Sequence, residues 1–176
     1  HGQASFGAES YDKLSDKGEL QAQRLGQYFK HILKESPYVV AGSMHRHQQT
    51  AQLALAECFP HSPVVTDSQW NEFNHQQVFA QYEPRFNEPH LLKSDVAQHV
   101  NPRAYLAKIF EGAIERWTGG EYHHEYEESW PIFKARVETA LQDLCDELAQ
   151  TKPRYAVVFT SGGVISVAAG KILELN

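Results

Sequence analysis

The sequence predicts an α/β domain of three layers, in which a mainly parallel sheet is covered by helices on both faces. Short apolar runs typical of strands occupy residues 38–41, 63–66 and 155–159. Between and after them, apolar residues recur every three or four positions, which is the period of an amphipathic helix. Strands that alternate with helices favour parallel pairing, because parallel strands need a long crossover connection.

Each expected helix has a recognisable start or end. Ser15 can cap a first helix, which Pro37 ends. A second helix is predicted over residues 46–58. Ser129 precedes the most regular helical pattern of the chain, and the last helix covers residues 164–173.

The middle of the chain is less regular. Residues 75–130 are rich in Asn, Gln, His and Pro, and we expect two or three irregular helices there. We interpret residues 75–127 as a cap-like helical insertion over the C-terminal ends of the strands, within a single domain of residues 1–176.

Composition limits the class of protein. The 176 residues are 41% hydrophobic and 22% charged, as in one globular domain, and no apolar run approaches the roughly 18 residues of a membrane span. The formal charge of −6 argues against a nucleic-acid surface, which needs a surplus of Lys and Arg. An anionic ligand would therefore have to meet a local cluster of cations.

The two cysteines, Cys58 and Cys145, lie inside apolar helical patterns. This is typical of buried free thiols rather than a disulfide framework, so the expected compartment is the cytoplasm.

Three motifs stand where predicted strands end. His1-Gly2-Gln3-Ala4 opens the sequence, GSMHRHQQTA occupies residues 42–51, and Thr160-Ser161-Gly162-Gly163 follows the last strand. In open parallel sheets, ligands bind beyond the carboxyl ends of the strands. An imidazole can attack phosphorus, a guanidinium can hold phosphoryl oxygens, and a helix start offers free N–H donors.

These three segments resemble the histidine phosphatase superfamily, also called the phosphoglycerate-mutase-like fold, and the resemblance covers essentially the whole chain. It implies phosphomonoester hydrolysis through a phosphohistidine at His1, with Arg46 binding the phosphoryl group. Ser161, Gly162, Gly163 and His45 would complete the phosphate-binding site. No cofactor or metal is implied, and the partner would be a small phosphorylated substrate or a phosphoprotein.

The resemblance also implies residues outside the printed sequence. The family's first arginine precedes the nucleophilic histidine, and a strand precedes that arginine. We therefore expect the native protein to extend beyond His1, and beyond Asn176 into a further strand.

Ser161 departs from the family, which has its second core histidine at this position. A serine hydroxyl donates one hydrogen bond but carries no charge, so the expected loss is about two to three decades in rate. His45, His47 or His75 could compensate.

Glu72 falls where many family members carry their general acid, which protonates the leaving oxygen. Glu128-Ser129 with Arg136 resembles a later element of the family. Helix capping and surface charge explain that element equally well.

Several alternatives remain open. A serine hydrolase would use Ser161, but the G-x-S-x-G pattern fails at Phe159 and leaves His1 and Arg46 unexplained. A metal site at residues 121–125 has no cysteine at suitable spacing, and a solvated polar loop is the simpler interpretation. A catalytically weak or inactive phospho-ligand or protein-binding relative is the main rival, and phosphoglycerate-mutase-type phosphotransfer is a weaker one.

Overall fold

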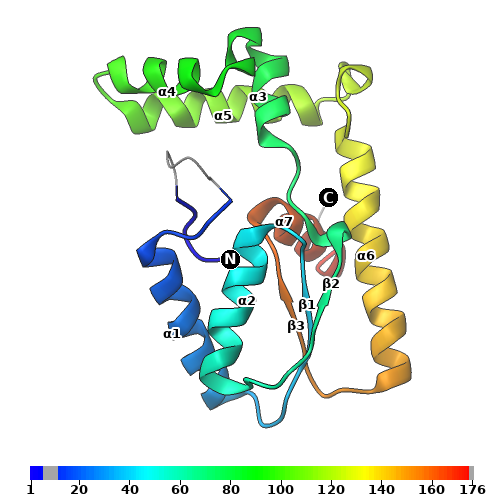
Figure 1. The fold of residues 1–176 in the computed structure, drawn as a ribbon. Coiled ribbons are helices and arrows are strands. Elements are labelled where there is room, and N and C mark those ends of the chain that lie inside the picture. Colours follow the sequence, from blue (N-terminus) through cyan, green and yellow to red (C-terminus); the bar gives the residue numbers. More distant parts are fainter. Residues whose placement is uncertain (6–11, 175–176) are drawn as a thin grey trace. The chain divides into compact units, whose positions relative to one another are not determined.

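The computed structural model describes residues 1–5 and 12–174, which fall into two compact units (Figure 1). Residues 1–72 and those from 136 onward form the first, which we call the sheet unit. Residues 73–135 form the second, which we call the helical unit.

The sheet unit is built on three parallel strands in the order β2-β1-β3. The strands are β1 (Tyr38–Ala41), β2 (Val64–Thr66) and β3 (Ala156–Phe159). Val40 pairs with Val65 on one side and with Val158 on the other. The predicted parallel sheet is thus confirmed, with β2 and β3 each beginning one residue later than expected.

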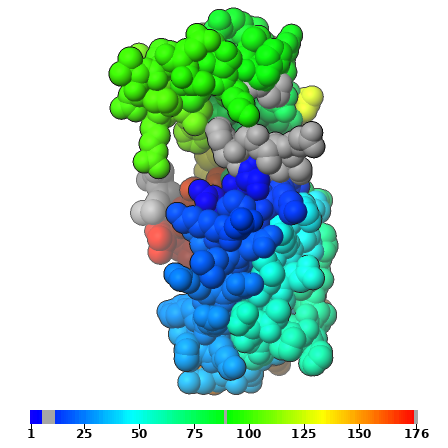
Figure 2. All heavy atoms as spheres, turned by 60° about the vertical axis from the view of Figure 1, so that its left-hand side comes forward, coloured from blue at the N-terminus to red at the C-terminus, as the bar shows by residue number. Residues whose placement is uncertain are grey.

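One face of the sheet is covered by α1 (Asp16–Ile32) and α2 (His45–Cys58), which lie side by side (Figure 2). The Ser15 hydroxyl accepts a hydrogen bond from the Gly18 amide at 3.1 Å, so the predicted cap is confirmed. The two helices approach closely because Gly26 has no side chain. A Cβ at this position would lie only 2.0 Å from the Ala54 carbonyl oxygen. The buried core between these helices and the sheet consists of Val39, Ala41, Ala51, Ala54, Leu55 and Phe159.

The opposite face packs against α6 (Trp130–Thr151) and α7 (Gly162–Ile172). Val40 points to this face and lines a small cleft with Ala140 and Leu144 of α6. The Lys171 ammonium of α7 lies 3.8 Å from the Glu138 carboxylate of α6, so these helices are neighbours. Helices on both faces give the three-layer α/β sandwich that the sequence predicted.

The expectation of buried thiols is wrong for Cys145, which is exposed, while Cys58 is half-buried. The apolar stripe of α6 runs through Val137, Leu141 and Leu144 at spacings of four and three. Because Cys145 directly follows Leu144, it is rotated about 100° away from that stripe. Both cysteines are free thiols.

The helical unit contains α3 (His75–Tyr82), α4 (Pro89–Gln98) and α5 (Pro102–Thr118), together with 3₁₀ turns at Pro84–Asn87 and His123–Glu125. Two of its asparagines cap helices. The side chains of Asn74 and Asn101 accept hydrogen bonds from amides in the first turns of α3 and α5. The aromatic core of this unit includes Phe73, Trp117 and Phe133.

A further 3₁₀ turn, Ser68–Trp70, belongs to the sheet unit. Across the described ranges, the helices fall short of the length and apolar character that crossing a bilayer requires.

Candidate active site

The candidate site lies at the carboxyl ends of β1 and β3. After β1 the chain enters α2 on one face of the sheet, and after β3 it enters α7 on the other face. Neighbouring strands whose helices leave in opposite directions form a topological switch point, where a crevice opens for a ligand. Here the switch point lies between the β1–α2 turn and the turn at Ser161.

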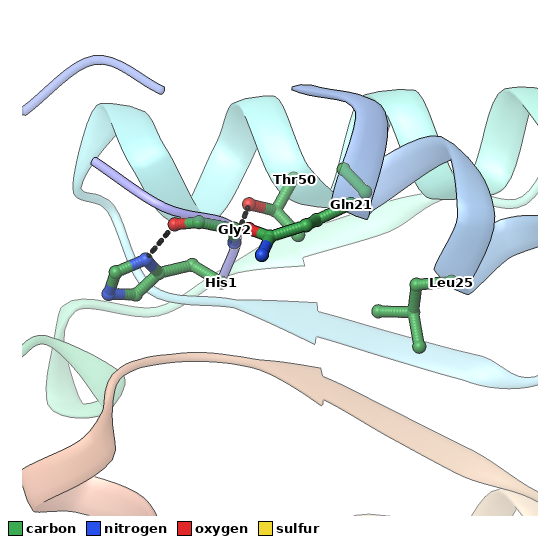
Figure 3. Close-up of a pocket in the computed structure, with 6 residues that line it drawn as sticks. His1, Gly2, Gln21, Leu25 and Thr50 are labelled. Carbon is green, nitrogen blue, oxygen red and sulfur yellow. Dashed lines mark hydrogen bonds between the residues drawn. The ribbon is translucent and has the colours of Figure 1, made fainter. Parts of the chain in front are cut away.

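His1 is held at this edge by backbone contacts. Its backbone nitrogen donates to the Thr160 carbonyl at 2.9 Å, just beyond β3. Its Nδ1 lies 2.6 Å from the Gly2 carbonyl oxygen (Figure 3). A carbonyl can only accept, so Nδ1 carries the proton and Nε2 of the neutral ring keeps its lone pair.

Thr50 connects His1 to α2. Its hydroxyl accepts from the Gly2 amide at 3.2 Å, as Figure 3 shows, and donates to the Arg46 carbonyl at 2.7 Å. Thr50 is 1% exposed. Thr50 therefore fixes the distance between His1 and the start of α2. In the sequence alone it looks like an ordinary helix-packing residue.

His47 lies beside His1, with ring centroids 5.5 Å apart. It is fully buried, and its Nε2 is 2.6 Å from the Ser161 hydroxyl oxygen. Burial lowers the pKa of His47 to about 4, with Arg46 as the next cause, so the ring is neutral at pH 7. Three histidines were expected to be able to compensate for the histidine that the family has at position 161. The ring of one of them, His47, contacts Ser161.

Arg46 is 5% exposed, and its Nη1 lies 2.7 Å from a carboxylate oxygen of Asp12. The same carboxylate accepts from the backbone amide of His45 at 2.8 Å. His45 itself is exposed, and this contact with Asp12 is made by its backbone amide. The sequence predicted that the Arg46 guanidinium at the start of this helix would bind an anion. In the structure the carboxylate of Asp12 pairs with it.

Glu72 is brought to the same edge from 91 residues away. Its Oε2 accepts a hydrogen bond from the Gly163 amide at 2.9 Å, in the first turn of α7. Arg136 supports the segment before Glu72, donating to the carbonyls of Gln69 at 2.6 Å and Asn71 at 2.9 Å. Gly162, the other predicted amide donor, begins α7, and a Cβ there would meet open space.

Two residues of this site were missed by the sequence analysis. Asp12 contacts Arg46, as described above, and Asn71 braces the β1–α2 turn. Asn71 Oδ1 accepts from the Met44 amide at 3.3 Å, and its Nδ2 donates to the Ser43 hydroxyl at 2.8 Å. In the sequence, the one feature that could have pointed to Asn71 as a site residue is its position directly before Glu72. For Asp12 a single sequence offers none.

A cavity of about 350 Å³ lies beside His1. Among the described residues it is lined by His1, Gly2, Gln21, Ala22, Leu25 and Thr50 (Figure 3). No lysine or arginine belongs to this lining. The buried guanidinium of Arg46 lies at the start of α2 and does not line this cavity.

The remaining polar candidates belong to the helical unit. Arg116 donates to Glu125 at 2.5 Å and lies over the Tyr122 ring. The indole of Trp117 donates to the Glu128 carbonyl at 2.9 Å, and the His75 ring packs edge-on against Phe79. Within residues 1–5 and 12–174, three or more metal-ligating side chains do not come together.

Comparison with solved structures supports this architecture. A putative α-ribazole-5'-P phosphatase from Escherichia coli aligns with a TM-score of 0.60 and 22% identity, covering 93% of this chain and 68% of its own. Phosphoglycerate mutase from Bacillus anthracis aligns with a TM-score of 0.65 and 17% identity, covering 97% and 76%. A mycobacterial glucosyl-3-phosphoglycerate phosphatase, solved with inorganic phosphate, aligns with a TM-score of 0.60 and 18% identity, covering 100% and 77%.

No curated protein matches the chain in sequence. The model of the histidine phosphatase superfamily (branch 1), in contrast, matches residues 2–176. With the switch-point site and the parallel sheet already in place, this match over nearly the whole length shows that the chain belongs to the histidine phosphatase superfamily.

Proposed function

We propose that the protein hydrolyses phosphomonoesters through a phosphohistidine formed at Nε2 of His1. The observation that carries this proposal is the 2.6 Å hydrogen bond from Nδ1 of His1 to the Gly2 carbonyl. It places the ring proton on Nδ1 and leaves a nucleophilic lone pair on Nε2. Phosphatases and a mutase among the structural neighbours are consistent with phosphoryl chemistry.

The phosphoryl oxygens would be held by Arg46, by the Ser161 hydroxyl and by backbone amides at the starts of α2 and α7. The His45 and Gly163 amides among these now donate to Asp12 and Glu72. A buried guanidinium with helix N-terminal amides is suited to a dianion in a weakly solvated site. A phosphoryl group that reaches Arg46 must share it with Asp12 or displace that carboxylate.

In the first step, Nε2 of His1 attacks phosphorus, the N–P bond forms and the ester P–O bond breaks. Glu72, in its protonated form, gives its proton to the leaving oxygen. In the second step, water attacks phosphorus and gives a proton to Glu72 as the P–N bond breaks. Inorganic phosphate leaves, and both side chains return to their starting forms.

The proposed substrate is a small phosphorylated molecule or a phosphoprotein, encountered in the cytoplasm. The names of two structural neighbours, an α-ribazole-5'-P phosphatase and a glucosyl-3-phosphoglycerate phosphatase, favour the small molecule. No cofactor takes part in the proposed steps.

The second candidate is a phospho-ligand-binding relative with weak or no turnover. It is favoured by Ser161, which brings no positive charge, and by the Asp12 carboxylate that already pairs with Arg46. Phosphoglycerate-mutase-type phosphotransfer ranks third. A mutase must hold the transferred group for return to substrate, and the uncharged Ser161 weakens that hold.

The test uses the full-length protein with p-nitrophenyl phosphate. We expect steady turnover by the unaltered protein, and an acid-labile, base-stable phosphoryl label after rapid quenching, as phosphohistidine requires. His1→Gln should abolish both. With an alkyl phosphate, whose poor leaving group needs protonation, Glu72→Gln should slow turnover about 100-fold or more.

His61→Gln is the matched control, because His61 is an exposed histidine in the α2–β2 connection. It should retain full activity. Turnover that survives His1→Gln would overturn the proposed nucleophile. Phosphate binding without turnover in the unaltered protein would establish the second candidate instead.

A further inference from the structure

The His47 side chain is fully buried where β1 and β3 end, although histidine is usually at least partly exposed. We propose that His47 is a positioning residue, which donates a hydrogen bond to Ser161 and so directs the Ser161 hydroxyl proton at a phosphoryl oxygen. The inference rests on the proposed phosphatase function. It begins from the 2.6 Å distance between His47 Nε2 and Ser161 Oγ.

The position of the imidazole proton follows from the surroundings of Nδ1. This atom is buried and has no hydrogen-bond partner among the described residues. It faces Gly42, where an added Cβ would lie 2.2 Å from Nδ1 and 2.8 Å from Asn71 Oδ1. A buried N–H without an acceptor is rarer and more costly than a buried lone pair. The neutral ring therefore carries its proton on Nε2.

With the proton on Nε2, Ser161 Oγ accepts the hydrogen bond from His47. The hydroxyl hydrogen of Ser161 must then point to a different acceptor. Ser161 is the N-cap residue of α7, yet its side chain makes no capping hydrogen bond. A phosphoryl oxygen beside His1 would supply that acceptor, because the His1 and His47 rings are neighbours.

The charge state of His47 agrees with this role. Burial and then the charge of Arg46 lower the pKa of His47, and Asp12 opposes them. The neutral ring has one N–H to donate, and that N–H is committed to Ser161. The hydroxyl is therefore oriented in the same direction over the whole neutral pH range.

The opposite assignment would make Ser161 a nucleophile and His47 its base. It would place a proton on Nδ1, which faces Gly42 with no acceptor among residues 1–5 and 12–174. A catalytic base of this kind is normally oriented by a third group that accepts from its other nitrogen. His47 lacks that group, which favours donation to the serine.

A double-mutant cycle tests whether His47 acts through Ser161. The variants are His47→Leu, Ser161→Ala and the double variant, compared with His47→Gln, whose amide N–H can replace that of Nε2. We expect kcat to fall about 30-fold for Ser161→Ala and about tenfold for His47→Leu. The double variant should be no slower than Ser161→Ala, and His47→Gln should recover most of the activity.

The same cycle is measured on the affinity for inorganic phosphate, so that it does not depend on turnover. Loss of turnover in the unaltered protein would end the proposed function, whereas non-additive phosphate affinities would still support the His47 role. Independent, multiplying effects of the two substitutions would overturn that role. Activity that survives His1→Gln and disappears with Ser161→Ala would overturn it in favour of a serine nucleophile.

Long-range ¹H–¹⁵N spectra of the imidazoles provide a readout that does not require any variant to fold. They should show His47 as the Nε2–H tautomer at pH 7, and its Nε2 resonance should shift when inorganic phosphate is added. An Nδ1–H tautomer would contradict the assignment. His61→Leu, at an exposed site, is the control for both the spectra and the kinetics.

Discussion

The guanidinium of Arg46 and the carboxylate of Asp12 form an ion pair at the start of α2, with 2.7 Å between Nη1 and Oδ1. Arg46 is buried, and the Asp12 side chain is 43% exposed. One partner is therefore fixed, while the other borders solvent. This asymmetry makes Asp12 an internal competitor for the site where we propose that phosphate binds.

Replacing Asp12 with Asn should strengthen phosphate binding. The substitution removes a negative charge beside Arg46 and keeps a side chain of similar size. We expect a three- to tenfold lower inhibition constant for inorganic phosphate, because the charge is partly exposed and therefore screened. The difference should shrink as the salt concentration rises.

Asp16→Asn is the matched control, since Asp16 is an exposed carboxylate in the first turn of α1. It should leave the inhibition constant unchanged. Weaker phosphate binding by Asp12→Asn would instead mean that Asp12 mainly holds Arg46 in its binding orientation.

Stability should depend on pH through His47. The pKa of His47 is about 4 in the folded protein, against an ordinary value of 6.5 that applies to the unfolded chain. Between pH 4 and pH 6.5 the unfolded chain therefore binds a proton that the folded protein does not. The contribution of neutral His47 is complete above pH 6.5 and is lost as the pH falls toward 4. It amounts to about 3 kcal/mol in the free energy of unfolding.

Urea unfolding at pH 7.5 and pH 4.5 measures this effect. The loss of stability on acidification should be smaller in His47→Gln than in the unaltered protein, because glutamine does not titrate. His61→Gln should behave like the unaltered protein. An equal loss in all three would show that His47 is not buried as a neutral ring.

Gly42 should tolerate no side chain while His47 is present. An alanine Cβ would lie 2.2 Å from His47 Nδ1, so Gly42→Ala should lower the free energy of unfolding by about 2 kcal/mol. Gly162→Ala is the stability control, because a Cβ there meets no atom within 4 Å. Thermal unfolding of both variants separates the collision from the general effect of replacing glycine.

The sequence was informative about where the site would be, because strand ends are visible as apolar runs that stop at small residues. Arg46 illustrates both the strength and the limit of this reasoning. A cation at a helix start is unfavourable without an anion, and that argument led to an anion site. It could not distinguish an external phosphate from Asp12, which is 34 residues earlier in the chain.

For a related reason, the hydrogen-bond partners of buried polar groups could not be predicted from the sequence. Hydrophobic periodicity locates His47 on a helix, but it does not specify which atom of a distant turn meets Nε2. The contact with Ser161 joins residues 114 positions apart, and it depends on strand order and on the absence of a side chain at Gly42. Both are properties of the packed sheet unit.

The position of the buried imidazole should be exchangeable between residues 47 and 161. Ser161→His alone should fail to raise activity, because Oγ of Ser161 is only 2.6 Å from the His47 ring and a second ring has no room. We expect it to lower the free energy of unfolding by about 2 kcal/mol. Combining it with His47→Ala empties the space that the new ring needs.

In that double variant the histidine at position 161 can contact the phosphoryl group directly and can carry a positive charge. Its kcat should therefore exceed that of His47→Ala alone by at least tenfold, with stability close to that of His47→Ala. Steady-state kinetics and thermal unfolding of the two single variants and the double variant measure both quantities. If Ser161→His is active and stable while His47 is present, the two side chains do not share one space, and the role assigned to the His47–Ser161 contact is wrong.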